Sequence, residues 1–162
     1  MSLTNTGYFH GSKINTLVEF DLSYAEIDHP FGPAIYLTKE KIVASCYSQR
    51  EGSIYCVYLS DNLKNTINLD ATYTSQTQEV QNILTKMFSN NELKEVVDLR
   101  KLIHPPGSNL KDMNSRLIAN GIWMIYGLLS PEEFGGLPDR GIQYAVLDKT
   151  CLCITDTTNY WT

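Results

Sequence analysis

The chain has 162 residues, of which 43% are hydrophobic and 19% are charged, and its formal net charge is −5. This length suits one globular domain with its own core and is too short for two comfortable ones. The acidic balance argues against general nucleic-acid affinity, which needs a basic face. No apolar run approaches the roughly 20 residues of a membrane span, and the N-terminus lacks a signal-peptide pattern. We therefore predict one cytoplasmic domain over residues 1–162, without a membrane partner.

The first half of the chain predicts alternating short strands and one helix. Residues 7–10 form the first expected strand, and residues 34–38 form the second, after a turn signalled by Pro30 and Pro33. Thr38 is a suitable cap for a helix that runs to about residue 49. Residues 53–60, in which Ile54, Cys56 and Tyr58 alternate with Tyr55, Val57 and Leu59, then predict the clearest strand of the sequence.

The second half is richer in helical patterns. Apolar spacing predicts an amphipathic helix over residues 76–89 and a shorter one over 92–103, which ends at His104 before two prolines. His104 is interpreted as a loop residue. Residues 110–129 also carry apolar side chains at helical spacing, although Gly121 and Gly127 weaken that helix. A loop follows, and residues 142–148 and 151–155 are expected as closing strands. The pattern indicates an α+β domain.

One set of residues suggests a binding site for a flat aromatic group. Tyr36 ends a predicted strand, and Tyr47 follows eleven residues later on the predicted helix, so the two rings can face each other across a slot. Two such rings suit nicotinamide, because offset stacking matches electron-rich and electron-poor aromatic faces. The backbone of Gly11 can then hold the carboxamide, and His10 can reach a ribose hydroxyl. The four cysteines complete no zinc-ligand pattern, so no metal site is predicted.

Three segments in order strengthen this hypothesis: YFHGSK (8–13), GPAIYLT (32–38) and GIQYAVLD (141–148). With the spacing of the two tyrosines, they resemble the His-Tyr-Glu branch of the ADP-ribosyltransferase superfamily, which includes diphtheria-type toxins and poly(ADP-ribose) polymerases. The resemblance implies a split β-sandwich of two small, mostly antiparallel sheets with flanking helices, and NAD as the substrate. It implies catalytic roles for His10, Tyr36 and Gln143, and cofactor contacts from His10, Gly11, Ser12, Tyr36 and Tyr47.

The chain departs from the family pattern at two positions. The catalytic glutamate of the last signature strand falls at Gln143, and a serine often found three residues before the second tyrosine falls at Ala44. Glutamine can accept a hydrogen bond from a hydroxyl but carries no charge, so we expect a loss of about 10²–10³ in rate. Glu132 and Glu133, in the preceding loop, are candidates to supply the missing carboxylate.

Three functions therefore stay open on the sequence alone. The first is an NAD-dependent mono-ADP-ribosyltransferase that acts on an unknown acceptor, with a protein as the expected acceptor. The second is an NAD-binding module with impaired catalysis, and the third is a fold-only interaction protein. Each candidate residue also has a simpler interpretation: a strand-end histidine for His10, core aromatics for Tyr36 and Tyr47, a polar strand residue for Gln143, and a solvated turn for Glu132 and Glu133.

Overall fold

The computed structural model describes residues 3–14, 19–20, 30–48, 51–60, 65–129 and 141–158. Within them, the strands are β1 (Leu3–Ser12), β2 (Ile35–Leu37), β3 (Ser53–Ser60), β4 (Thr66–Asn68), β5 (Met124–Leu128), β6 (Ile142–Val146) and β7 (Leu152–Thr158). The helices are α1 (Lys41–Ser48), α2 (Gln78–Met87), α3 (Asn90–Glu95), α4 (Arg100–Ile103) and α5 (Leu110–Ala119), with short 3-10 helices at Tyr73–Ser75 and Lys149–Cys151.

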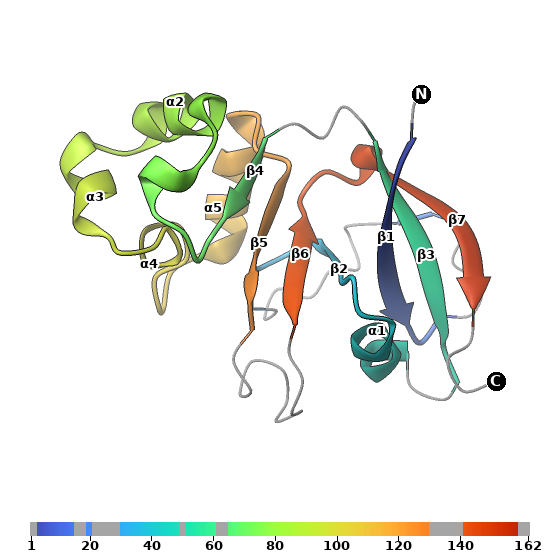
Figure 1. The fold of residues 1–162 in the computed structure, drawn as a ribbon. Coiled ribbons are helices and arrows are strands. Elements are labelled where there is room, and N and C mark those ends of the chain that lie inside the picture. The colour runs from blue at the N-terminus through green and yellow to red at the C-terminus, as the bar shows by residue number, and fades with distance from the viewer. Residues whose placement is uncertain are drawn as a thin grey trace.

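The strands form two small sheets that stand next to each other (Figure 1). One has three strands in the order β1-β3-β7, and the other has four in the order β2-β6-β5-β4. Every pairing is antiparallel except that of β4 with β5, whose connection runs through α2, α3, α4 and α5. The expected α+β fold with two small, mostly antiparallel sheets is confirmed.

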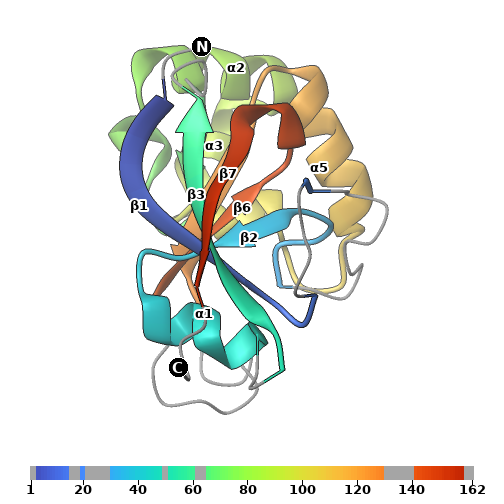
Figure 2. The ribbon, with the colours of Figure 1, turned by 90° about the vertical axis from the view of Figure 1, so that its right-hand side faces the viewer.

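The backbones of the two sheets are hydrogen-bonded to each other at Phe9 and Thr38. Phe9 in β1 donates its backbone N–H to the carbonyl of Thr38 at 2.7 Å, and Thr38 donates back to Phe9 at 3.0 Å. Thr38 was predicted to cap the following helix, but α1 begins at Lys41, and the Thr38 hydroxyl accepts the N–H of Glu40 instead. In Figure 2 the three-stranded sheet faces the viewer, and β2 and β6 lie behind it.

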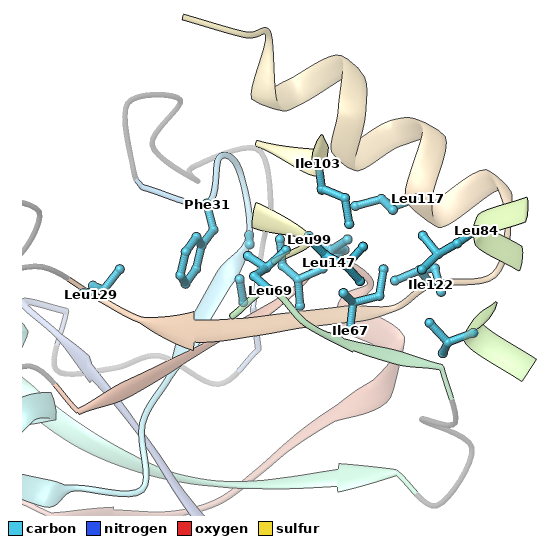
Figure 3. Close-up of a cluster of buried hydrophobic side chains, with 14 of the residues drawn as sticks. Phe31, Ile67, Leu69, Leu84, Leu99, Ile103, Leu117, Ile122, Leu129 and Leu147 are labelled. Atoms are coloured by element: carbon cyan, nitrogen blue, oxygen red, sulfur yellow. The ribbon is translucent and has the colours of Figure 1, made fainter. Parts of the chain in front are cut away.

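Two separate cores hold these layers together. The inter-sheet core fills the space between the two sheets with side chains such as Tyr8, Leu37, Tyr55 and Tyr144. The helix-side core covers the opposite face of the four-stranded sheet, where α2 to α5 gather in Figure 1. Figure 3 shows its buried side chains, which include Phe31, Ile67, Leu99, Ile103, Leu117 and Leu147. The four-stranded sheet is therefore buried on both faces.

Burial on both faces explains the main error of the sequence prediction. The helix expected over residues 110–129 ends at Ala119, Gly121 takes a left-handed conformation (φ +86°), and Met124–Leu128 is the strand β5. A strand buried on both faces has a continuous apolar run, which spacing alone does not distinguish from a helix. The three-residue strand β4 was missed, and the helix expected over 92–103 divides into α3 and α4.

Helix α1 rests directly on β1 at Gly11. A Cβ atom built there would lie 1.8 Å from the backbone oxygen of Ala44 and 3.1 Å from the backbone nitrogen of Ser48. The obstacle is main chain, so trimming a side chain of α1 cannot relieve it. Glycine at this position therefore sets how closely the helix that carries Tyr47 approaches the edge of β1.

We expect Gly11→Ala to lower the free energy of unfolding by about 3 kcal/mol, the upper end of the usual cost of overpacking. Ser12→Ala is the matched control, because the Ser12 hydroxyl accepts only the exposed N–H of Ile14, and about 0.5 kcal/mol is expected there. Urea unfolding of both variants measures the difference. Equal stability of the two would contradict this contact.

Candidate functional site

The strand register places Tyr36 and Gln143 on the same face of the four-stranded sheet. Tyr36 in β2 lies opposite Ala145 in β6, and Gln143 is two residues before Ala145. Side chains two apart on a strand share a face, and diagonal neighbours on paired strands are roughly 7–8 Å apart. Ala145 belongs to the helix-side core, so both candidate residues point toward that side. The structure thus brings together two residues that are 107 positions apart in the sequence.

The phenol of Tyr36 is held by the turn that precedes β2. Its hydroxyl donates to the carbonyl of Gly32 at 2.7 Å and accepts the backbone N–H of Phe31 at 3.0 Å. The ring lies nearly parallel to that of Phe31, with centroids 6.2 Å apart and an interplanar angle of 14°. Burial raises the pKa of Tyr36 well above its usual value, although the hydrogen bond from Phe31 opposes the rise. The Tyr36 side chain is therefore neutral and is held in one position by its hydrogen bonds.

Tyr47 reaches the same side of the molecule from α1. It is half-buried and packs against the helix-side core, as Tyr36 does. Burial raises the pKa of Tyr47 to about 12. Tyr47 also contributes, after burial, to the rise in the pKa of Tyr36. That both tyrosines serve one binding site stays a prediction.

His10 joins β1 to the backbone of Tyr36. Its Nδ1 atom lies 2.8 Å from the Tyr36 carbonyl oxygen, and because a carbonyl can only accept, Nδ1 carries the proton. Burial lowers the pKa of His10, and the hydrogen bond to Tyr36 only partly offsets this. The ring is consequently neutral near pH 7, and its Nε2 atom is an acceptor. Phe20 packs edge-on against the imidazole at 5.0 Å.

The backbone of Gly11 faces the edge where the two sheets separate. The hydrogen bonds between Phe9 and Thr38 direct the polar backbone groups of Phe9 away from β3. Backbone direction repeats every second residue along a strand, so the N–H and C=O of Gly11 point to the same edge. Ser12, the other predicted cofactor contact on β1, uses its hydroxyl to accept the N–H of Ile14.

Gln143 is the most unusual residue of the group. Its side chain is only 1% exposed, and its Nε2 atom has no hydrogen-bond partner among the described residues. Directly opposite in β5 is Gly127, where a Cβ atom would lie 2.4 Å from Nη2 of Arg100. A buried polar group without a partner costs about 1–3 kcal/mol. Asn65, His104 and Ser108 also carry a buried polar atom without a partner among the described residues, so the unpartnered Nε2 of Gln143 does not by itself identify a ligand.

No protein-family model matches this chain, and no significant match to a curated protein is found. The candidate site consequently stands on its own geometry and on the sequence motifs. Glu132 and Glu133 lie outside the described residues. In the described part of the chain, no three His, Cys, Asp or Glu side chains gather as metal ligands, and no helix there has the length and apolar character to cross a bilayer.

Sequence reasoning missed the layer of residues behind the site. Arg100 donates from Nε and Nη2 to one oxygen, Oδ1, of Asp70 (2.9 and 2.6 Å) and from Nη2 to the carbonyl of Leu128. Its guanidinium lies 5.1 Å from the centre of the Phe31 ring. Asn114 donates a hydrogen bond to the carbonyl of Phe31 in the turn that holds Tyr36, and His104 is hydrogen-bonded to Asn114. His104, expected in a loop, is buried with 9% exposure. The available sequence signal was Asn114 itself, a polar residue among the apolar residues of the helix predicted over 110–129.

Burial of His104 predicts a pH dependence of stability. Burial and the nearby Arg100 lower the pKa of His104, while the hydrogen bond to Asn114 opposes this. Below the unfolded pKa of about 6.5 the unfolded chain binds the proton more readily, so the contribution is complete above that pH and is lost on acidification. The free energy of unfolding should fall by at most about 1.4 kcal/mol per pH unit from this group.

Urea unfolding between pH 7.5 and 5.5 measures this slope, and His104→Gln provides the comparison because glutamine does not titrate. The variant should show a shallower decline than the parent over this range, with the remaining slope due to His10, whose pKa is also lowered. Identical slopes in the two proteins would show that His104 takes up its proton equally well in the folded state.

Proposed function

We propose that this protein is an NAD-dependent mono-ADP-ribosyltransferase with slow turnover. The observation that carries the proposal is the buried Gln143, whose Nε2 atom has no partner within the described residues and which shares a sheet face with Tyr36. This is the position of the catalytic glutamate in the family that the sequence resembles. A cytoplasmic location and a protein acceptor belong to the same proposal.

The arrangement supports binding of the nicotinamide half of NAD. Tyr36 and Tyr47 supply neutral aromatic faces, which suit a flat cationic ring. The Gly11 backbone offers one N–H donor and one C=O acceptor at the edge of β1, which match the carbonyl oxygen and the amide NH2 group of a carboxamide. The Nε2 lone pair of His10 accepts a hydroxyl of a ribose, because Nδ1–H is already committed to Tyr36.

The reaction follows from these contacts. The bond between C1′ of the ribose and the nicotinamide nitrogen breaks, and its electron pair leaves with nicotinamide. Positive charge develops on the ribose, as in glycoside hydrolysis. An acceptor oxygen or nitrogen attacks C1′, and its proton passes to solvent, since Gln143 cannot take it. The amide of Gln143 orients a ribose hydroxyl but does not stabilise the charge, so the rate is low.

An NAD-binding module without catalysis is the second candidate. It is favoured by the neutrality of the described site: Gln143 has no charge, burial keeps His10 neutral, and burial raises the pKa values of Tyr36 and Tyr47. These groups bind a nucleotide as well as they would in an enzyme. They provide no carboxylate for the transition state.

Two pairs of variants separate these functions, with NAD affinity measured by calorimetry and turnover by nicotinamide release. Tyr36→Ala should abolish binding because it removes a wall of the slot. Tyr73→Ala is its control, since Tyr73 is half-buried against the same helix-side core but lies outside the site. Loss of affinity in both would indicate a general effect on folding.

Gln143→Glu should raise nicotinamide release about 10²–10³-fold with little change in affinity, because a charge opposite the ribose acts mainly in the transition state. Gln78→Glu adds the same charge at an exposed position of α2 and should change neither NAD affinity nor nicotinamide release. Binding without release, in the parent and in Gln143→Glu, favours the binding module. No binding at millimolar NAD overturns both functions and leaves the interaction protein.

A further inference from the structure

The turn that holds the Tyr36 phenol is itself held from outside by α5. Asn114 in that helix is 3% exposed, and its Nδ2 atom donates to the carbonyl of Phe31 at 2.8 Å and lies 3.5 Å from the carbonyl of Pro33. Gly32 sits between these two carbonyls, with φ of +77°. A Cβ atom there would lie 2.8 Å from Nδ2 of Asn114, so only glycine admits this approach.

Hydrogen-bond chemistry fixes the orientation of each group in this chain. The Asn114 nitrogen faces two carbonyls, so its Oδ1 atom is an acceptor. His104 places Nε2 3.0 Å from that oxygen, and Nε2 must therefore carry the proton. Nδ1 of His104 is then a bare lone pair, and it is buried without a hydrogen-bond partner among the described residues. The His104 ring also stacks on Phe31, with centroids 6.3 Å apart.

We propose that Asn114 is a positioning residue for the nicotinamide slot, and that His104 orients Asn114. The chain of contacts runs from His104 through Asn114 to the turn at Phe31 and Gly32, and from that turn to the Tyr36 hydroxyl. Asn114 and His104 are not themselves proposed to contact NAD. The role toward NAD rests on the proposed function, whereas the clamp on Tyr36 is a property of the fold.

Asn114→Ala removes the donor that holds the turn. It should raise the dissociation constant for NAD about tenfold, which equals about 1.4 kcal/mol. In nicotinamide release it should raise KM and leave kcat nearly unchanged, because an aromatic wall contacts the ground state and the transition state alike. Asn109→Ala is the matched control: Asn109 caps the same helix by accepting the N–H of Asp112, and within the described residues its side chain makes no hydrogen bond to the turn or to Tyr36.

A second pair of variants tests the role of His104 without altering Asn114. His104→Gln keeps an N–H donor for Asn114 and should retain most of the NAD affinity. His104→Leu removes that donor and should weaken binding in the same direction as Asn114→Ala. A purely structural role would lower stability in His104→Leu and leave the affinity of the folded protein unchanged, and that result would overturn the proposal.

Tyr36 can also be observed without NAD. In a chain labelled with 13C on its tyrosine rings, Tyr36→Phe identifies the Tyr36 signal, which should shift in Asn114→Ala and stay in place in Asn109→Ala. If the unsubstituted chain binds no NAD, the proposed function and the role toward NAD both fail. A shifted signal then still supports the clamp. A Tyr36 signal that does not move in Asn114→Ala overturns the clamp itself.

Discussion

The backbone pair between Phe9 and Thr38 is the contact on which the arrangement of the site depends. It is the point at which β1 of one sheet meets the end of β2 of the other. Beyond it toward Tyr36, the strands no longer pair directly, and the His10 side chain bridges to the Tyr36 carbonyl in place of a ladder bond. One polar strand edge is thereby left at Gly11, next to an aromatic ring. If the two sheets were continuous, the backbone N–H and C=O groups of this edge would be hydrogen-bonded to the next strand.

The groups at the site share an electrostatic character. His10, His104, Tyr36 and Tyr47 all have pKa values shifted toward their neutral forms, chiefly by burial. The positive charge of Arg100 behind the site is paired with Asp70 at 2.6 Å. A neutral and fixed surface binds an aromatic ring with little reorganisation, but it provides no charge opposite a developing cation. In the proposed function, binding and catalysis therefore make different demands, and Gln143 is where they differ.

The sequence predicted the parts of the site that lie within short local motifs. Strands near His10, Tyr36 and Gln143 were expected from alternation and turn signals, and the strand register then set the shared face of Tyr36 and Gln143. What it could not predict came from long-range packing. The strand β5 is buried on both faces, so its apolar run fitted a helical spacing equally well. The three residues of β4 are too few to show any period.

The same limit explains why Asn114 and His104 escaped notice. Their partner, Phe31, is 83 positions from Asn114, and no local pattern shows which helix will cover a turn. The supporting layer depends on close approach of helices to the backbone: Gly32 admits α5 at the turn before β2, just as Gly11 admits α1 at β1. Gly11 therefore sets how closely α1 approaches β1, and Gly32 sets how closely α5 approaches the turn that holds Tyr36. The Tyr36 residue has little freedom to turn, because its hydroxyl and its backbone carbonyl are both hydrogen-bonded. In the proposed nicotinamide slot, this side of the slot is therefore already fixed before NAD binds, which lowers the entropic cost of binding.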